Sequence, residues 1–300
     1  FTDNIQMILV IVLLIISFFI IKNSNLDQFS FKFIGEKNPH LISASYIPGY
    51  TAGLTFFIAV AATNLFHQGN WQRVYAAKNF VTLKKSLIFS FFIIIPIVFY
   101  TGFVGMVAFS IDPVNRPDLG FFSLLLKNNS TMLSLIVIIL GLALTISTVD
   151  TLVNAISSLI VVDGKAVIEF KKRKKINYLK FSKYVILLLS LISFFIASKG
   201  FDILYLFLLA DLFCCAFVFT IFYSFFDKRI NEKTAYFSII IGLIGGLLLF
   251  PSPDFSKSLL VGFLLSKELF TPFINQSLLF VSFLIATFLP LVVLKLKKFK

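Results

Sequence analysis

A series of eight apolar runs constrains the fold of this 300-residue chain more than any other feature. A helix needs about 20 mainly apolar residues to cross a hydrocarbon core of about 30 Å. Because 58% of the residues are hydrophobic and only 14% are charged, a soluble globular domain and a disordered chain are both excluded. The sequence predicts an all-α, polytopic membrane protein with spans at 5–21, 49–66, 86–110, 131–162, 184–198, 203–226, 235–250 and 277–294.

The placement of the basic residues predicts the orientation of these spans. If the first span starts inside, 19 of the 27 Lys and Arg residues fall in inner segments, and cytoplasmic loops are enriched in such residues. We therefore expect a multi-pass protein of the cell membrane with both ends of this chain in the cytoplasm. The basic run 171–175 is interpreted as a topology determinant at the lipid headgroups, so no nucleic-acid partner is expected.

The chain is expected to form a single transmembrane domain over residues 1–300, because no internal repeat or linker divides it. The outer segments 22–48 and 251–276 contain Pro and Gly, and we expect short helices there rather than further spans. The chain starts without Met and opens directly into an apolar helix. We therefore expect it to be a piece of a longer protein.

The densest group of polar residues inside a span lies in 147–158. At about 100° per residue, Ser147, Asp150, Thr151, Asn154 and Ser158 fall on one stripe of a helix. Hydroxyl, carboxylate and carbonyl oxygens are the ligands that a hard cation such as Na⁺ requires. The alternative is that these small polar residues only join helices in the membrane.

A second polar group follows the span at 49–66. Gly69 and Asn70 have low helix propensity, so an unwound or bent segment is predicted there. Many secondary transporters expose backbone groups to their substrates at broken helices of this kind. The alternative is an ordinary helix end, with Trp71 as an interfacial anchor and Arg73 extending to the headgroups.

Asp211 is a further acid within a span, about nine residues or roughly 13 Å from the outer end of its helix. A carboxylate at that depth needs a partner, water or a proton. Enzyme chemistry has no comparable signal, because metalloprotease, nucleophile-elbow, P-loop and dinucleotide motifs are absent and the two histidines lie in different segments. We therefore do not expect an enzyme.

Two segments resemble the sodium:solute symporter family. The stretch NLFHQGNWQRVYAAK at 64–78 resembles the sequence that follows the broken core helix of these carriers, and LTISTVD at 144–150 resembles their sodium-site helix. The resemblance implies a LeuT-type inverted repeat, in which the span at 49–66 belongs to the broken sixth core helix. The second repeat would then occupy about 49–226, with most of the first repeat missing.

The resemblance also implies roles for individual residues. Ser147 and Thr148 match the hydroxyl pair that binds sodium, and Leu144 occupies a position whose backbone carbonyl is a ligand. Asp150 is added as a candidate sodium ligand because it lies on the same polar stripe. Residues expected to bind the solute are His67, Gln68, Trp71 and Asn64, and those expected to act in gating or coupling are Arg73 and Asp211.

These observations predict sodium-coupled symport of a small organic solute by alternating access. The solute is expected to be urea-like or amino-acid-like, and the expected partners are that solute, Na⁺ and the lipid bilayer. Because only half of each site is present, we expect that this chain cannot transport alone. The alternatives are proton coupling through Asp150 and Asp211, and a membrane sensor or structural subunit that transports nothing.

Overall fold

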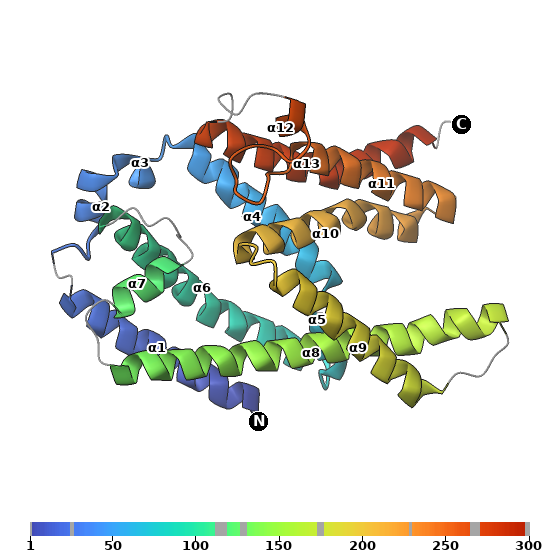
Figure 1. Ribbon diagram of the computed structural model, residues 1–300, viewed down its shortest axis with the longest axis horizontal. Coiled ribbons are helices and arrows are strands. Elements are labelled where there is room, and N and C mark those ends of the chain that lie inside the picture. Colours follow the sequence, from blue (N-terminus) through green and yellow to red (C-terminus); the bar gives the residue numbers. More distant parts are fainter. Residues whose placement is uncertain are drawn as a thin grey trace. The chain divides into compact units, whose positions relative to one another are not determined.

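The computed structural model describes residues 2–24, 27–111, 119–126, 131–172, 177–227, 230–264 and 271–297, and these are helical almost throughout (Figure 1). Eight helices within these ranges are long and apolar enough to cross a membrane, which confirms the predicted all-α, polytopic fold. The basic run at 171–175 was interpreted as a topology determinant, and its residues 173–175 lie outside the described part of the chain.

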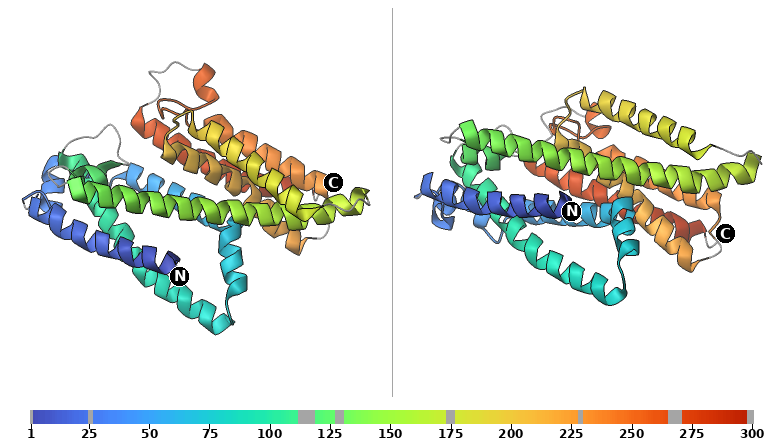
Figure 2. Two further views of the ribbon diagram at one scale, coloured as in Figure 1. Left: turned by 60° about the horizontal axis from the view of Figure 1, so that its bottom comes forward. Right: turned by 90° about the horizontal axis from the view of Figure 1, so that it is seen from below.

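Each predicted span corresponds to one of the eight long helices. Figure 2 shows that the longest of them, α8, is one continuous helix, and it extends to Lys172, well past the predicted end at 162. The long helices are α1 (Thr2–Ser24), α4 (Ile47–Phe66), α6 (Phe80–Ile111), α8 (Thr131–Lys172), α9 (Tyr178–Ala197), α10 (Ile203–Phe226), α11 (Glu232–Leu249) and α13 (Pro272–Lys297). The short helices are α2 (Phe31–Lys37), α3 (Pro39–Ile42), α5 (Gln68–Ala76), α7 (Gly120–Leu126) and α12 (Val261–Leu264).

The chain forms two compact units, each with its own core. Unit 1 comprises Phe1–Ser45 and Gln68–Ile192, and unit 2 comprises Tyr46–His67 and Ser193–Lys300. The chain therefore passes between the units three times: after Ser45, after His67 between α4 and α5, and after Ile192 within α9. The expected single domain and the expected repeat at about 49–226 stay predictions.

The core of unit 1 brings together α1, α2, α6, α7 and α8. Its polar contacts are few and specific: the hydroxyl groups of Ser17 and Tyr100 are 2.9 Å apart, and the Asn38 amide donates to the Ser110 hydroxyl at 3.1 Å. These bonds satisfy polar groups that hydrocarbon could not solvate. The buried apolar residues of this core are Ile21, Ile34, Val104, Val107, Ala108, Leu124, Leu125 and Val137.

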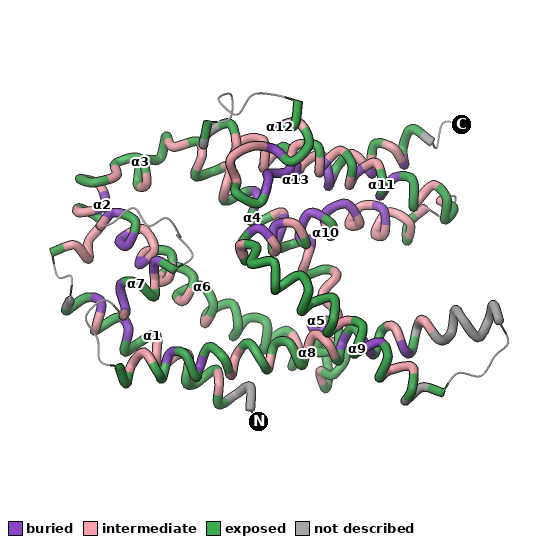
Figure 3. Tube along the Cα trace, viewed as in Figure 1, coloured by how far each residue is buried: buried purple, intermediate pink, exposed green. Residues whose placement is uncertain are grey.

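Unit 2 is a bundle of α4, α10, α11 and α13. The buried residues are concentrated along α10 and α13 (Figure 3). Each of these two helices contacts the other three helices of the bundle. By contrast, only 6% of an 18-residue apolar stretch within α6 is buried. An apolar helix with so little cover is suited to lipid and not to water.

Glycines bring α11 and α13 into close contact. A Cβ atom on Gly246 would lie 2.9 Å from the Cβ of Ala286 and 3.3 Å from the carbonyl oxygen of Ser282. The Ser282 hydroxyl also donates to the Gly246 carbonyl at 2.7 Å. Small residues and a hydrogen bond between helices are the usual means of packing helices in lipid, where the hydrophobic effect does not drive association.

A compact loop between α11 and α13 covers the end of the unit 2 core. Phe255 has a φ of 52°, a conformation that costs energy for a residue with a side chain. Its ring packs edge-on against Tyr205, with 6.0 Å between the ring centroids, and this burial offsets the backbone strain. The hydroxyl groups of Ser252 and Ser256 donate to the carboxylate of Asp254 at 2.5 and 2.6 Å.

These serine hydroxyl groups make the loop sensitive to acid. The bonds from Ser252 and Ser256 lower the pKa of Asp254 from 3.8 to about 2. Because the folded pKa is lowered, the ionised Asp254 stabilises the loop above about pH 4, and this contribution is lost as the pH falls toward 2. We expect Asp254→Asn to increase hydrogen exchange of residues 250–260 a few-fold at neutral pH, measured by mass spectrometry. A difference that persists unchanged near pH 2 would contradict this.

Candidate functional site

The predicted sodium ligands Leu144, Ser147 and Thr148 lie within one turn of α8. The Thr148 hydroxyl donates to the backbone carbonyl of Leu144 at 2.8 Å, so the structure brings these two oxygens together. In the regular helix the Leu144 carbonyl also accepts the backbone N–H of Thr148, whereas the Thr148 oxygen keeps its lone pairs and remains able to bind a cation. Ser147 and Leu144 are half-buried, whereas Thr148 is exposed.

The rest of the predicted polar stripe continues along the same helix. The Thr151 hydroxyl donates to the Ser147 carbonyl at 2.9 Å, and the Asn154 amide donates to a carboxylate oxygen of Asp150 at 3.1 Å. Asp150 is exposed, and its carboxylate accepts this hydrogen bond from the next turn of the helix. We call this row of side-chain and carbonyl oxygens from Leu144 to Asn154 the oxygen ladder of α8. That its members bind a sodium ion stays a prediction.

Gln6 in α1 is a polar contact of this region that the sequence interpretation missed. Its side-chain amide donates to the carbonyl of Ala143 at 3.4 Å, directly before Leu144 in α8. Gln6 and Ala143 also border an otherwise apolar cavity of about 320 Å³ between the two helices. The signal was available, because Gln6 is a polar residue within the first apolar run, and such residues commonly mark a functional or packing contact.

The predicted irregular segment is present, but it lies earlier than expected. α4 ends at Phe66, His67 has an extended backbone with a φ of −72° and a ψ of 103°, and a new helix starts at Gln68. Gly69 and Asn70 are helical, so the expectation that they form the break was wrong. Helix propensity is a weak guide here, because the first turn of a helix tolerates residues that disfavour its interior.

The predicted solute-binding residues lie on both sides of this break. The Asn64 amide donates to the Val60 carbonyl at 2.8 Å, and His67 occupies the break itself. In α5, the rings of Trp71 and Tyr75 contact each other with 6.3 Å between centroids. Asn64 and His67 belong to unit 2, whereas Gln68, Trp71 and Arg73 belong to unit 1. A common cavity for these residues stays a prediction.

Asp211 has a partner that the sequence did not reveal. Its carboxyl group in α10 accepts a hydrogen bond from the hydroxyl of Thr63 in α4, and only 6% of Asp211 is exposed. Thr63 lies one turn before the break at His67. The structure therefore connects the buried acid to the last turns of α4, and both residues belong to unit 2.

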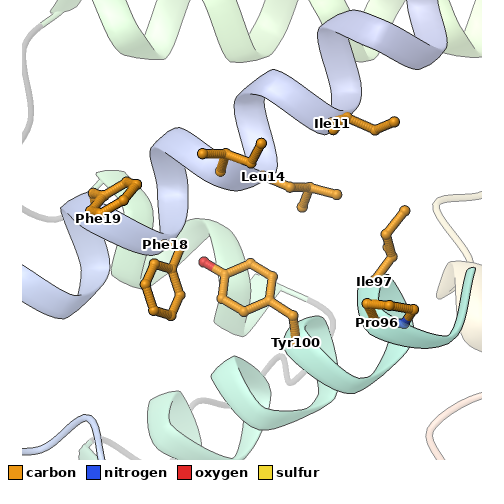
Figure 4. A pocket seen from close by; sticks show the side chains of 8 residues that line it. Ile11, Leu14, Phe18, Phe19, Pro96, Ile97 and Tyr100 are labelled. Carbon is orange, nitrogen blue, oxygen red and sulfur yellow. The ribbon is translucent and has the colours of Figure 1, made fainter. Parts of the chain in front are cut away.

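A cavity of about 490 Å³ between α1 and α6 does not suit a polar solute (Figure 4). Its lining is apolar except for Tyr100, whose hydroxyl group is already engaged with Ser17. A site for a polar solute needs several donors or acceptors to fix the ligand, and this lining provides none that is unengaged. The other residues that line it are Ile11, Leu14, Ile15, Phe18, Phe19, Pro96 and Ile97.

The fold and these polar segments can be compared with known proteins. A sequence model of the sodium:solute symporter family matches residues 1–242, which run from α1 into α11. Searches of curated proteins and of solved structures each found no match. The matched range covers most of the chain and includes the oxygen ladder of α8, the break at His67 and the Thr63–Asp211 contact. The chain therefore belongs to the sodium:solute symporter family.

Proposed function

We propose that the protein carries a small organic solute across the membrane together with Na⁺. The observation that carries this proposal is the turn of α8 at Leu144–Thr148, where a hydroxyl and a carbonyl oxygen are joined within the range matched by the symporter family. Membership in a family of transporters also argues against enzyme activity. Sodium and solute are coupled if both stabilise the same conformation of the carrier. The solute is then carried along with Na⁺, and the sodium gradient provides the energy for its uptake.

The sodium site that we propose uses the Leu144 carbonyl and the hydroxyl groups of Ser147 and Thr148. Asp150 lies on the same stripe and supplies negative charge near the ion. All of these ligands are oxygens, which suits a hard cation, and they lie on a regular helix that fixes their spacing. The remaining ligands would come from other segments of the transporter.

The solute would be recognised around the break between α4 and α5. Asn64, His67, Gln68 and Trp71 offer amide, imidazole and indole groups, which together can donate to and accept from a neutral polar molecule. This chemistry favours a urea-like or amino-acid-like solute. Arg73 and Asp211 are proposed to act in gating or coupling, and the orientation with both ends of the chain in the cytoplasm of the cell follows from the charge distribution.

Transport assays in reconstituted vesicles test this function. The full-length protein, purified and placed in proteoliposomes, should accumulate radiolabelled urea or a radiolabelled amino acid several-fold when Na⁺ is outside and K⁺ inside. Replacing external Na⁺ by K⁺ should abolish the accumulation, and a sodium ionophore should dissipate it. Accumulation that is equally fast with K⁺ on both sides would exclude sodium coupling.

A further inference from the structure

The buried carboxyl group of Asp211 lies at the contact of α10 with α4, in the core of unit 2. Its exposed fraction is 6%, and Leu208 and Leu212, on either side of it along α10, are 1% and 0% exposed. On the α4 side of the core, Ala59 and Ala62 are also buried, and the Cys215 thiol lies 3.9 Å from the Ile58 carbonyl. An acid in such surroundings requires its charge to be removed or balanced.

The groups that face Asp211 do not provide a balancing charge. Thr63 is its hydrogen-bond partner from α4, and the thiols of Cys214 and Cys215 on α10 itself interact with it electrostatically. α13 contributes Thr287, whose hydroxyl donates to the Phe283 carbonyl at 2.7 Å. Among the residues that the structure describes, no Lys, Arg or His forms an ion pair with Asp211.

A metal ion or a bound solute fits this position poorly. The side-chain oxygens that meet here are those of Asp211 and Thr63, fewer than a hard cation takes as ligands. No group of three or more His, Cys, Asp and Glu residues that could hold a metal occurs in the described part of the chain. The almost complete burial of Asp211 also leaves little of its surface for a solute. A proton needs neither additional ligands nor space.

We propose that Asp211 is a proton-binding site that joins α10 to α4 next to the break at His67. This inference rests on the proposed transport function, to which it adds a pH-sensitive step. In the packed arrangement the carboxyl group is neutral, and Thr63 donates to one of its oxygens. When α4 and α10 separate, water enters, the O–H bond of the acid breaks, and the proton moves to water and leaves a hydrated carboxylate.

The position of Thr63 explains why such a step would affect transport. Thr63 is four residues before His67, so it lies one turn from the point where α4 ends. A change in the bond to Asp211 therefore acts on the segment that leads into the proposed solute-binding residues. The site is distinct from the oxygen ladder of α8, which belongs to unit 1.

Infrared spectroscopy of the purified full-length protein tests the proton site without requiring transport. At neutral pH, we expect the carbonyl stretch of a protonated carboxylic acid, which Asp211→Asn should remove. Thr63→Val keeps the acid but removes its hydrogen-bond donor, so the band should remain and shift in frequency. If Asp211→Asn does not fold, the shift in Thr63→Val provides the test.

A matched control is available on the same helix. Thr220 of α10 is 1% exposed, and its hydroxyl lies 3.0 Å from that of Ser238 in α11, so Thr220→Val removes a comparable buried bond. This variant should leave the carboxylic acid band unchanged. A wild-type protein without the band at neutral pH, or a band that survives in Asp211→Asn and is unshifted in Thr63→Val, would overturn the inference. Sodium-driven uptake by a protein without the band would contradict the proton site alone, whereas a band without sodium-driven uptake would contradict the proposed symport alone.

Discussion

Replacing Ser147 and Thr148 together by Ala should lower the apparent sodium affinity of the full-length transporter by at least about tenfold. Each hydroxyl that binds a charged ligand contributes about 1.5–3 kcal/mol, and 1.4 kcal/mol corresponds to a factor of ten. The Leu144 carbonyl survives the substitution, so some binding should remain. The measurement is the sodium dependence of solute uptake in proteoliposomes, with protein amount in the vesicles compared by immunoblot.

α8 provides a matched control for this prediction. The Thr145 hydroxyl donates to the Gly141 carbonyl at 2.8 Å, the same bond that Thr148 makes with Leu144, but Thr145 lies on the opposite side of the helix from Ser147. Thr145→Ala should therefore leave the apparent sodium affinity unchanged. Equal losses in Thr145→Ala and in the double variant would indicate a general effect on α8, and an unchanged affinity in the double variant would remove both residues from the site.

Substituting Gly246 by Val should strongly destabilise unit 2. The first added atom would already meet Ala286, and the branched side chain would force α11 away from α13. The bond from the Ser282 hydroxyl to the Gly246 carbonyl, which is buried, would lengthen or break. We expect a loss of at least about 2 kcal/mol, the combined cost of overpacking and of a lost buried hydrogen bond.

The midpoint of thermal unfolding in detergent measures this effect. Gly102 in α6 serves as the control, because a Cβ atom there would meet nothing within 4 Å. Gly102→Val places the same side chain in a helix interior and should change the midpoint little. A Gly246→Val protein as stable as the Gly102→Val protein would mean that the contact between α11 and α13 does not limit stability.

The membrane-spanning helices could be predicted from the sequence because hydrocarbon leaves a long apolar segment little choice but to form a helix. The polar stripe of α8 could be predicted for a related reason, since a regular helix places residues three and four positions apart on one face. Ser147 lies on this stripe, and the prediction that Ser147 and Thr148 bind sodium came from the family resemblance.

Contacts between distant segments could not be predicted. Thr63 meets Asp211 across 148 residues, and Gln6 meets Ala143 across 137 residues, so no local pattern connects either pair. The break at His67 was missed by two to three residues, because the low helix propensities of Gly69 and Asn70 do not by themselves decide where a helix ends. Polar residues within apolar runs were the useful signal, although they do not identify their partners.

Simultaneous measurement of sodium and solute entry tests the central claim most directly. Proteoliposomes containing the full-length protein would be given radioactive sodium together with radiolabelled urea or amino acid. The symport proposal predicts that the transported solute accelerates sodium entry, that sodium accelerates solute entry, and that both effects are lost in the Ser147→Ala, Thr148→Ala double variant. Solute entry that proceeds at the same rate without sodium, and without any accompanying sodium flux, would contradict it.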